Sequence, residues 1–89
     1  MIVQFDKSFG KSLDKIKDPT ILSRIELAII KAEKASTLEA IPNIKKLTGF
    51  SDYFRIKIGD YRLGFERLDE QTIRIIIISH RKDIYRKFP

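Results

Sequence analysis

The segment YFRIKIGDYRL, residues 53–63, decides the fold because it is predicted to form a β-hairpin. Its first half alternates apolar and polar side chains, which places Phe54, Ile56 and Ile58 on one face of a strand. Gly59-Asp60 is a two-residue turn signal, and glycine in first place suits a type II′ turn. A two-residue turn sets the register by counting, so the predicted facing pairs are Ile58–Tyr61, Lys57–Arg62, Ile56–Leu63 and Arg55–Gly64.

Other strands are expected on both sides of this hairpin. Its second strand should run from Tyr61 to about Arg67, and another strand should run from Thr72 to Ser79. Four consecutive isoleucines at 75–78 are apolar on both faces, which is typical of a central strand covered on both sides. Met1 to Phe5 is the first strand, and Arg81 to Phe88 is a short helix or an ordered tail.

Two helices are predicted between the first strand and the hairpin. Asp6 or Ser8 can cap the first, whose apolar stripe carries Phe9, Leu13 and Ile16. Asp18-Pro19 suits the start of a second helix that continues to about Ala35. From Ser36 to Asn43 the pattern supports a single turn at most. The sequence therefore predicts one α+β domain over residues 1–89, of βααβββ order, with a helical hairpin packed on one face of a mostly antiparallel four-stranded sheet.

The composition limits the class of partner. The chain has 18 basic and 12 acidic residues, a net charge of +6, which attracts polyanions or an acidic partner protein. The simpler interpretation is that the charge only maintains solubility. No cysteine and a single histidine argue against a zinc site, so we expect no metal and no cofactor. No apolar run approaches the ~20 residues of a membrane span, and the N-terminus resembles a strand, so a cytoplasmic protein without membrane contact is expected.

The predicted register gathers cations on one face of the hairpin, namely Arg55, Lys57 and Arg62. Facing like charges destabilise a sheet, so the arrangement is intelligible if an anion normally binds there. The alternative is a solvated face on which basic residues prevent edge-to-edge association. Gly64 favours the first interpretation slightly, because its missing side chain leaves a gap beside Arg55 where a ligand could approach.

His80 ends the last predicted strand and should lie near Arg62, but the loop around residues 69–71 decides whether the two share a face. Arg81, Lys82 and Tyr85 follow, adding charge and a stacking surface. Cleavage of RNA without a metal needs a base for the 2′-hydroxyl proton, cations for the phosphorane and an acid for the leaving oxygen. The candidate catalytic residues are Arg55, Lys57, Arg62, His80, Arg81 and Tyr85.

Two blocks resemble the RelE/ParE superfamily of toxins, and RelE-type mRNA interferases in particular. KKL at 45–47, Gly49 and the segment 53–63 resemble the central block of these toxins, and ISHRKDIYR at 78–86 resembles their C-terminal signature HRxDxYR. The resemblance covers essentially the whole chain. It implies a ribosome-dependent endoribonuclease that cuts messenger RNA in the A site and stops translation. It also implies a RelB-like antitoxin whose acidic segment wraps a toxin that is monomeric alone.

The resemblance also implies roles for individual residues. Arg62 matches the arginine that contacts the scissile phosphate, and Arg55 and Lys57 match strand positions of basic catalytic residues. His80 or Arg81 matches the C-terminal acid and phosphate-binding positions, and Tyr85 matches the base-stacking aromatic. Further RNA contacts are expected from Lys45, Lys46, Tyr53, Lys82 and Arg86.

The chain departs from the family pattern at two positions. Arg55 replaces a lysine found in some members, and an arginine, which stays protonated, is a poor general base. Lys57 or His80 would then accept the proton. Ser79 stands where many relatives have glycine, which could alter the angle of the His80 side chain.

Two other functions remain open at this point. A ParE-like protein of the same fold would poison DNA gyrase without hydrolysis, although such relatives generally lack the full set of Arg62, His80, Arg81 and Tyr85. A non-catalytic member would only bind RNA or an antitoxin. The codon preference and the identity of the general base also remain open.

Overall fold

The hairpin predicted from residues 53–63 forms in the computed structural model, which describes residues 1–89. β3 (Tyr53–Ile58) pairs with β4 (Tyr61–Asp69) in the predicted register throughout. Gly59 has a φ of +57°, whereas Asp60 does not have a positive φ, as a type II′ turn requires. The turn predicted from the glycine position is therefore confirmed.

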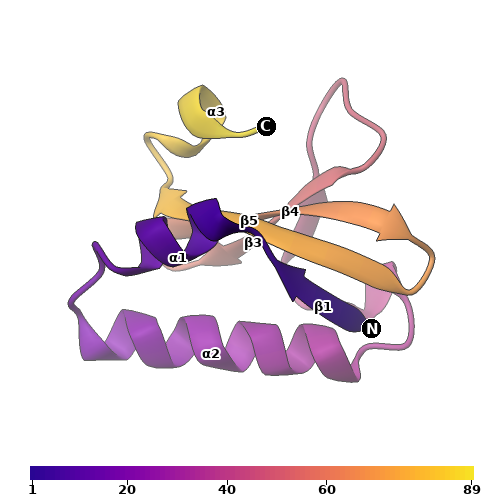
Figure 1. Ribbon diagram of the computed structural model, residues 1–89, viewed down its shortest axis with the longest axis horizontal. Coiled ribbons are helices and arrows are strands. Elements are labelled where there is room, and N and C mark those ends of the chain that lie inside the picture. Colours follow the sequence, from indigo (N-terminus) through magenta and orange to yellow (C-terminus); the bar gives the residue numbers. More distant parts are fainter.

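Five strands form one mixed sheet in the order β1-β5-β4-β3-β2 (Figure 1). β5 (Thr72–His80) runs antiparallel to β4, and β1 (Ile2–Phe5) runs parallel to β5. β2 (Ile44–Lys46) pairs antiparallel with β3 at the other edge. The prediction of four strands was therefore wrong. β2 was missed because three residues with two lysines show no alternating pattern.

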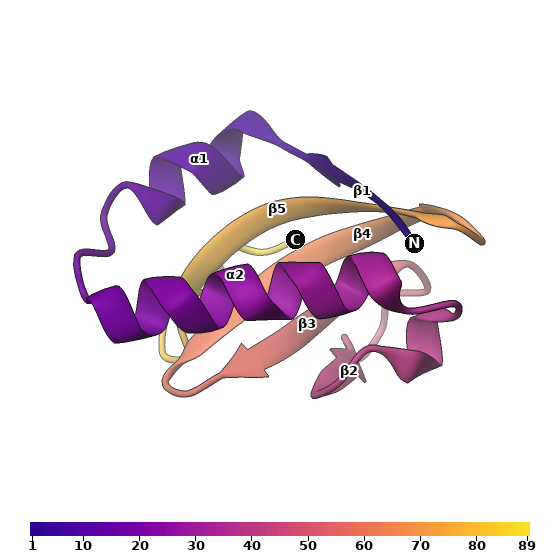
Figure 2. The same cartoon turned by 90° about the horizontal axis from the view of Figure 1, so that it is seen from below.

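α2 (Pro19–Lys34) covers one face of the sheet (Figure 2). Its start is as predicted, because the Asp18 carboxylate accepts a hydrogen bond from the Thr20 amide at 2.9 Å. Ile25 and Ala32 are its buried residues, and they join the main core with apolar side chains of β3, β4 and β5. The turn η1 (Leu38–Ala40) follows. None of the helices is long and apolar enough to cross a membrane.

α1 (Lys7–Leu13) differs from the prediction, because it lies along the edge of β5 instead of joining α2 on the face of the sheet (Figures 1 and 2). β1 pairs only with the first half of β5. Beyond that point Ser8 Oγ lies 2.6 Å from the Ile76 carbonyl oxygen, and Ser12 Oγ accepts a hydrogen bond from the Ile78 amide at 3.0 Å. Two serine hydroxyls thus occupy the edge that a longer β1 would have covered.

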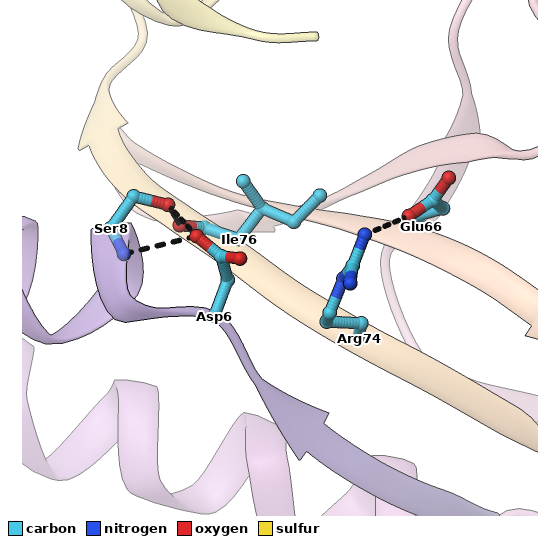
Figure 3. Close-up of polar contacts among 5 residues, drawn as sticks. All are labelled: Asp6, Ser8, Glu66, Arg74 and Ile76. Carbon is cyan, nitrogen blue, oxygen red and sulfur yellow. Dashed lines mark hydrogen bonds and ion pairs between the residues drawn. The ribbon is translucent and has the colours of Figure 1, made fainter.

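Asp6 fixes the start of α1 (Figure 3). Its carboxylate accepts hydrogen bonds from the hydroxyl and the backbone amide of Ser8, and these bonds lower the pKa of Asp6 below its usual value. A lowered pKa in the folded state means that this cap stabilises the protein above the ordinary aspartate pKa and is lost as the pH falls further. Because the Ser8 hydroxyl has one hydrogen, it donates either to Asp6 or to the Ile76 carbonyl.

α3 (Ile84–Lys87) lies on the opposite face of the sheet from α2 (Figure 1). Ile84 and Phe88 form a second buried cluster with Leu47, against which Ile76 and Ile77 pack. An irregularity of register between Gly64 and Phe65 leaves Ile76 without a facing residue in β4. Because Ile75 and Ile78 belong to the main core, β5 is covered on both faces, as the isoleucine run predicted.

Replacing Ser12 with alanine tests the edge contact. The change removes the acceptor for the Ile78 amide, so we expect the free energy of unfolding to fall by roughly 1–2 kcal/mol. Ser23→Ala is the matched control, because Ser23 is exposed on α2 and alanine favours a helix. Chemical denaturation measures the stability, and hydrogen exchange of the Ile78 amide should accelerate in the Ser12 variant alone. Equal stability of the two variants contradicts this account of the edge.

Candidate nucleic-acid interface

The face of the sheet opposite α2 carries the cations that the sequence placed together. Arg55 and Lys57 of β3 alternate with buried core residues, so both point to this face. Lys57 is paired with Arg62, and Arg55 is paired with Lys45 of β2. Directly paired residues share a face, so the cationic face consists of Lys45, Arg55, Lys57 and Arg62.

No acidic side chain neutralises the cationic face. The structure contains four ion pairs, and each uses another cation: Arg67–Asp52, Arg74–Glu66, Arg81–Asp60 and Arg86–Asp83. Arg62 Nη1 instead donates to the backbone carbonyl oxygens of Gly59 at 2.8 Å and Tyr61 at 2.9 Å. These neutral acceptors orient the guanidinium and leave its positive charge uncompensated, which suits an anionic ligand.

At the end of the same face away from the Gly59-Asp60 turn, the positive charge is neutralised by an ion pair. Glu66 of β4 faces Arg74 of β5 there, and Arg74 Nη2 donates to Glu66 Oε1 at 2.7 Å (Figure 3). Arg67 points to the other face, since it is paired with the buried Ile73, and there it forms an ion pair with Asp52 at 3.0 Å. The unpaired cations are therefore confined to the half of the face near β2 and the Gly59-Asp60 turn.

Tyr85 of α3 contacts the cationic face. Arg55 Nε donates to the Tyr85 hydroxyl oxygen at 3.0 Å, across 30 residues of sequence. The Tyr85 side chain nevertheless remains 63% exposed, so its ring is free to stack on a planar ligand. The contact places an exposed aromatic ring beside the unpaired cations.

The gap at Gly64 does not hold a ligand, contrary to the expectation from sequence. Phe88 fills it, and a Cβ atom added at residue 64 would lie 2.8 Å from Phe88 Cδ2. Phe88 is 2% exposed, so it is a core residue of the small cluster under α3. The missing side chain of Gly64 therefore serves the close packing of the C-terminal segment on the sheet.

His80 lies on the other face of the sheet. Its partner in β4 is Tyr61, with ring centroids 5.7 Å apart, whereas Arg62 is paired with Ser79. Tyr61 packs against the main core, so His80 points to the face of the sheet that α2 covers. At the edge of β5 it lines a hollow that also contains Lys11 of α1, Lys15, and Lys87 of α3. The sequence left this choice of face open, and the register of β4 with β5 decides it.

The remaining residues of the C-terminal signature disperse around the end of β5. Arg81 lies at the Gly59-Asp60 turn, where its amide donates to the Asp60 carbonyl at 2.8 Å and its Nε lies 3.8 Å from Asp60 Oδ1. Arg86 forms an ion pair with Asp83, and the side chain of Lys82 is exposed. Among residues 80–86, only Tyr85 forms a side-chain hydrogen bond with a residue of the cationic face.

A hollow of about 580 Å³ adjoins the cationic face, between α3 and the loop that joins β2 to β3. Three of the predicted RNA-binding residues, Lys45, Lys46 and Tyr53, line it together with Tyr85. Phe50 lines it too and was not predicted, although an aromatic residue directly after Gly49 in a polar loop is a detectable signal. No group of three or more His, Cys, Asp or Glu side chains is arranged to hold a metal ion.

Comparisons with known proteins decide the family. The family model described as ParE toxin of type II toxin-antitoxin system, parDE, matches residues 3–85. Toxin RelE3 of Methanocaldococcus jannaschii is 38% identical over 90 residues, which cover 100% of both chains. The chain belongs to the RelE/ParE family of toxins. The resemblance identified from the two sequence blocks is therefore confirmed.

Solved structures of family members share the fold of this RelE/ParE toxin. The toxin is similar to a chain of the RelB-RelE antitoxin-toxin complex from Methanococcus jannaschii, with a TM-score of 0.78 and 36% identity over 97% of this chain and 99% of that one. It is also similar to a chain of the intact RelBE complex of E. coli, with a TM-score of 0.69 and 23% identity over 89% and 94%. The second likeness concerns the fold alone.

A Gly64→Ala variant tests the packing of the C-terminal segment. The added methyl group collides with Phe88, so we expect a loss of about 1–3 kcal/mol in the free energy of unfolding. The Arg55–Tyr85 contact should weaken as well, because Tyr85 lies in α3 and Phe88 directly follows that helix. Gly10→Ala is the control, since nothing lies within 4 Å of a Cβ atom there and alanine favours the helix. Denaturation curves and NMR shifts of the Tyr85 ring measure both effects, and unchanged curves for Gly64→Ala would refute them.

Proposed function

We propose that this toxin is a ribosome-dependent endoribonuclease that cuts messenger RNA in the A site and inhibits translation. The observation that supports it best is the cationic face, where Arg55, Lys57 and Arg62 lack acidic partners and Tyr85 presents an exposed ring. Cations bind the RNA phosphates, and an exposed aromatic ring can stack on an unpaired base. The relationship to toxins named RelE is in line with this activity.

The proposed reaction uses the RNA's own 2′-hydroxyl as nucleophile. The 2′-oxygen attacks the adjacent phosphorus, the bond to the 5′-oxygen breaks, and a 2′,3′-cyclic phosphate and a 5′-hydroxyl result. Arg62 binds the non-bridging phosphate oxygens, and its contacts with the turn carbonyls hold it in place before the substrate arrives. Charge stabilisation of this kind requires no metal ion.

Proton transfer requires a base and an acid besides Arg62. Lys57 is the proposed base, because Arg55 stays protonated and His80 points to the other face. The proton for the leaving 5′-oxygen is assigned to His80 at the end of β5, which requires its side chain to turn around the strand end. Arg81 stays protonated like Arg55, so its proposed role is to bind a phosphate oxygen. Tyr85 holds the neighbouring base by stacking.

We further propose an acidic antitoxin segment as the inhibitor. Two related toxin structures are described as RelB-RelE or RelBE complexes. The unneutralised cationic face of this toxin suits a partner of the same kind. A second feature that favours a protein partner is a hollow between α1 and α2 lined by Phe5, Leu22 and Ile30, all of which are exposed. The toxin alone is proposed to be a monomer and to form a heteromer with its antitoxin.

A gyrase poison is the second candidate, because the family model that matches residues 3–85 is named for ParE. Such a protein would need no scissile-phosphate site. A supercoiling assay with purified gyrase separates the two activities, since only the second candidate blocks supercoiling while leaving messenger RNA intact.

Arg62→Ala should abolish the arrest of growth that the wild-type toxin causes on induction. Primer extension on an abundant messenger RNA should show new 5′ ends inside translated codons with the wild type, reduced by roughly 10²–10³-fold in the variant because a positioned charge donor is lost. Lys57→Ala should reduce cleavage by about 10²–10⁴-fold if Lys57 is the base.

Lys17→Ala is the matched control, because Lys17 is an exposed lysine in the segment between α1 and α2. It should cut as the wild type does, at equal protein level. Growth arrest with intact messenger RNA and impaired supercoiling would transfer the assignment to gyrase. Soluble, folded toxin without any arrest would leave only a binding function.

A further inference from the structure

The hollow beside the cationic face is built by a loop that stands up from the sheet. Figure 1 shows the segment between β2 and β3 rising on the same side as α3, so that a space opens between the two. Phe50 of this loop is 44% exposed, whereas Phe88, which also lines the hollow, is buried. Lys45, which is paired with Arg55, contributes positive charge to the rim.

The aromatic walls of this hollow are held in fixed positions. The Tyr53 ring meets Phe50 and Phe88 edge to face, with centroids 5.6 Å apart in both pairs. The Leu47 amide donates to the Tyr53 carbonyl at 2.9 Å, and the Phe50 amide donates to the Leu47 carbonyl at 3.3 Å. Gly49 has a φ of +86°, which allows the tight return of the chain. These contacts therefore hold the loop in one conformation before any ligand binds.

We infer that this hollow binds one unpaired nucleobase of the RNA, stacked against Phe50, with a flanking phosphate bound by Lys45. The inference rests on the proposed function and names a second base site for the same substrate. An exposed aromatic ring beside a basic side chain is the combination by which proteins hold single strands, because every base has a stacking face and every linkage a charge. A fixed ring also loses little conformational freedom on binding.

The position along β3 relates this site to the cleaved linkage. Tyr53 lies four residues before Lys57, about 13 Å along an extended strand, and Arg55 with its bonded Tyr85 lies halfway. A single strand of RNA whose scissile phosphate lies at Lys57 and Arg62 therefore passes Tyr85 and reaches the hollow about two nucleotides further on. The nucleotide in the hollow is recognised through the area of its ring, so a purine should bind more tightly than a pyrimidine.

The test is a mutant cycle on binding, without cleavage. A short single-stranded RNA with a 2′-deoxy nucleotide at the cleaved position cannot react, and its affinity for the toxin is measured by fluorescence anisotropy at low salt. Abasic nucleotides are placed at successive positions of this RNA. Phe50→Ala removes the ring, Phe50→Tyr keeps it, and Leu68→Ala removes an exposed apolar side chain from the end of β4.

Phe50→Ala should weaken binding by about tenfold, while Phe50→Tyr and Leu68→Ala should leave it unchanged. One abasic position should weaken the wild type by a similar factor and have no further effect in Phe50→Ala, which identifies the base that contacts the ring. Equal abasic penalties in the wild type and Phe50→Ala, or no measurable binding by the wild type, would overturn the inference.

The outcome is separable from that of the proposed function, because binding is measured on RNA that cannot be cut. An abasic penalty that disappears in Phe50→Ala, together with uncut messenger RNA in induced cells, would retain the base site and reject the nuclease. Messenger RNA cleavage together with equal abasic penalties in the wild type and Phe50→Ala would retain the nuclease and reject the base site. Unchanged amide NMR spectra outside residues 47–53 confirm that Phe50→Ala keeps the fold.

Discussion

The two-residue turn at Gly59-Asp60 sets the register of β3 against β4, and the arrangement of the cationic face depends on it. A shift of one residue would send Lys57 and Arg62 to opposite faces, one of them into the core under α2. Glycine with a positive φ makes this turn possible, and the carbonyl oxygens at the turn accept hydrogen bonds from the Arg62 guanidinium. The element that folds the hairpin thus also orients the side chain proposed to bind the scissile phosphate.

The facing pair of Lys57 and Arg62 is unfavourable for the isolated protein, by a few tenths of a kcal/mol or more. The structure contains acidic residues near other arginines, such as Glu66 beside Arg74 and Asp52 beside Arg67. The absence of such partners on the cationic face is therefore a local property of that face. It fits a surface that binds phosphate in the active toxin and an acidic segment in the inhibited one.

Much of the fold could be predicted from sequence because the informative patterns are local. The alternation around Phe54, the turn at Gly59 and the cap at Asp18 each involve a few neighbouring residues, and all three predictions are confirmed. The face of His80 could not be predicted, since it depends on how β5 pairs with β4 after the 69–71 loop. Gly64 was misinterpreted for a similar reason, because Phe88, 24 residues further along the chain, occupies the space beside it.

The salt dependence of RNA binding tests the central claim most directly, namely that the cationic face binds the phosphates of the RNA. For single strands, the slope of log affinity against log salt concentration changes by about 0.7 for each phosphate contact. The account predicts that Lys57→Ala and Arg62→Ala each reduce this slope by about 0.7, while Lys17→Ala leaves it unchanged. Slopes equal to that of the wild type in all three variants would contradict it, because the RNA would then bind to another surface.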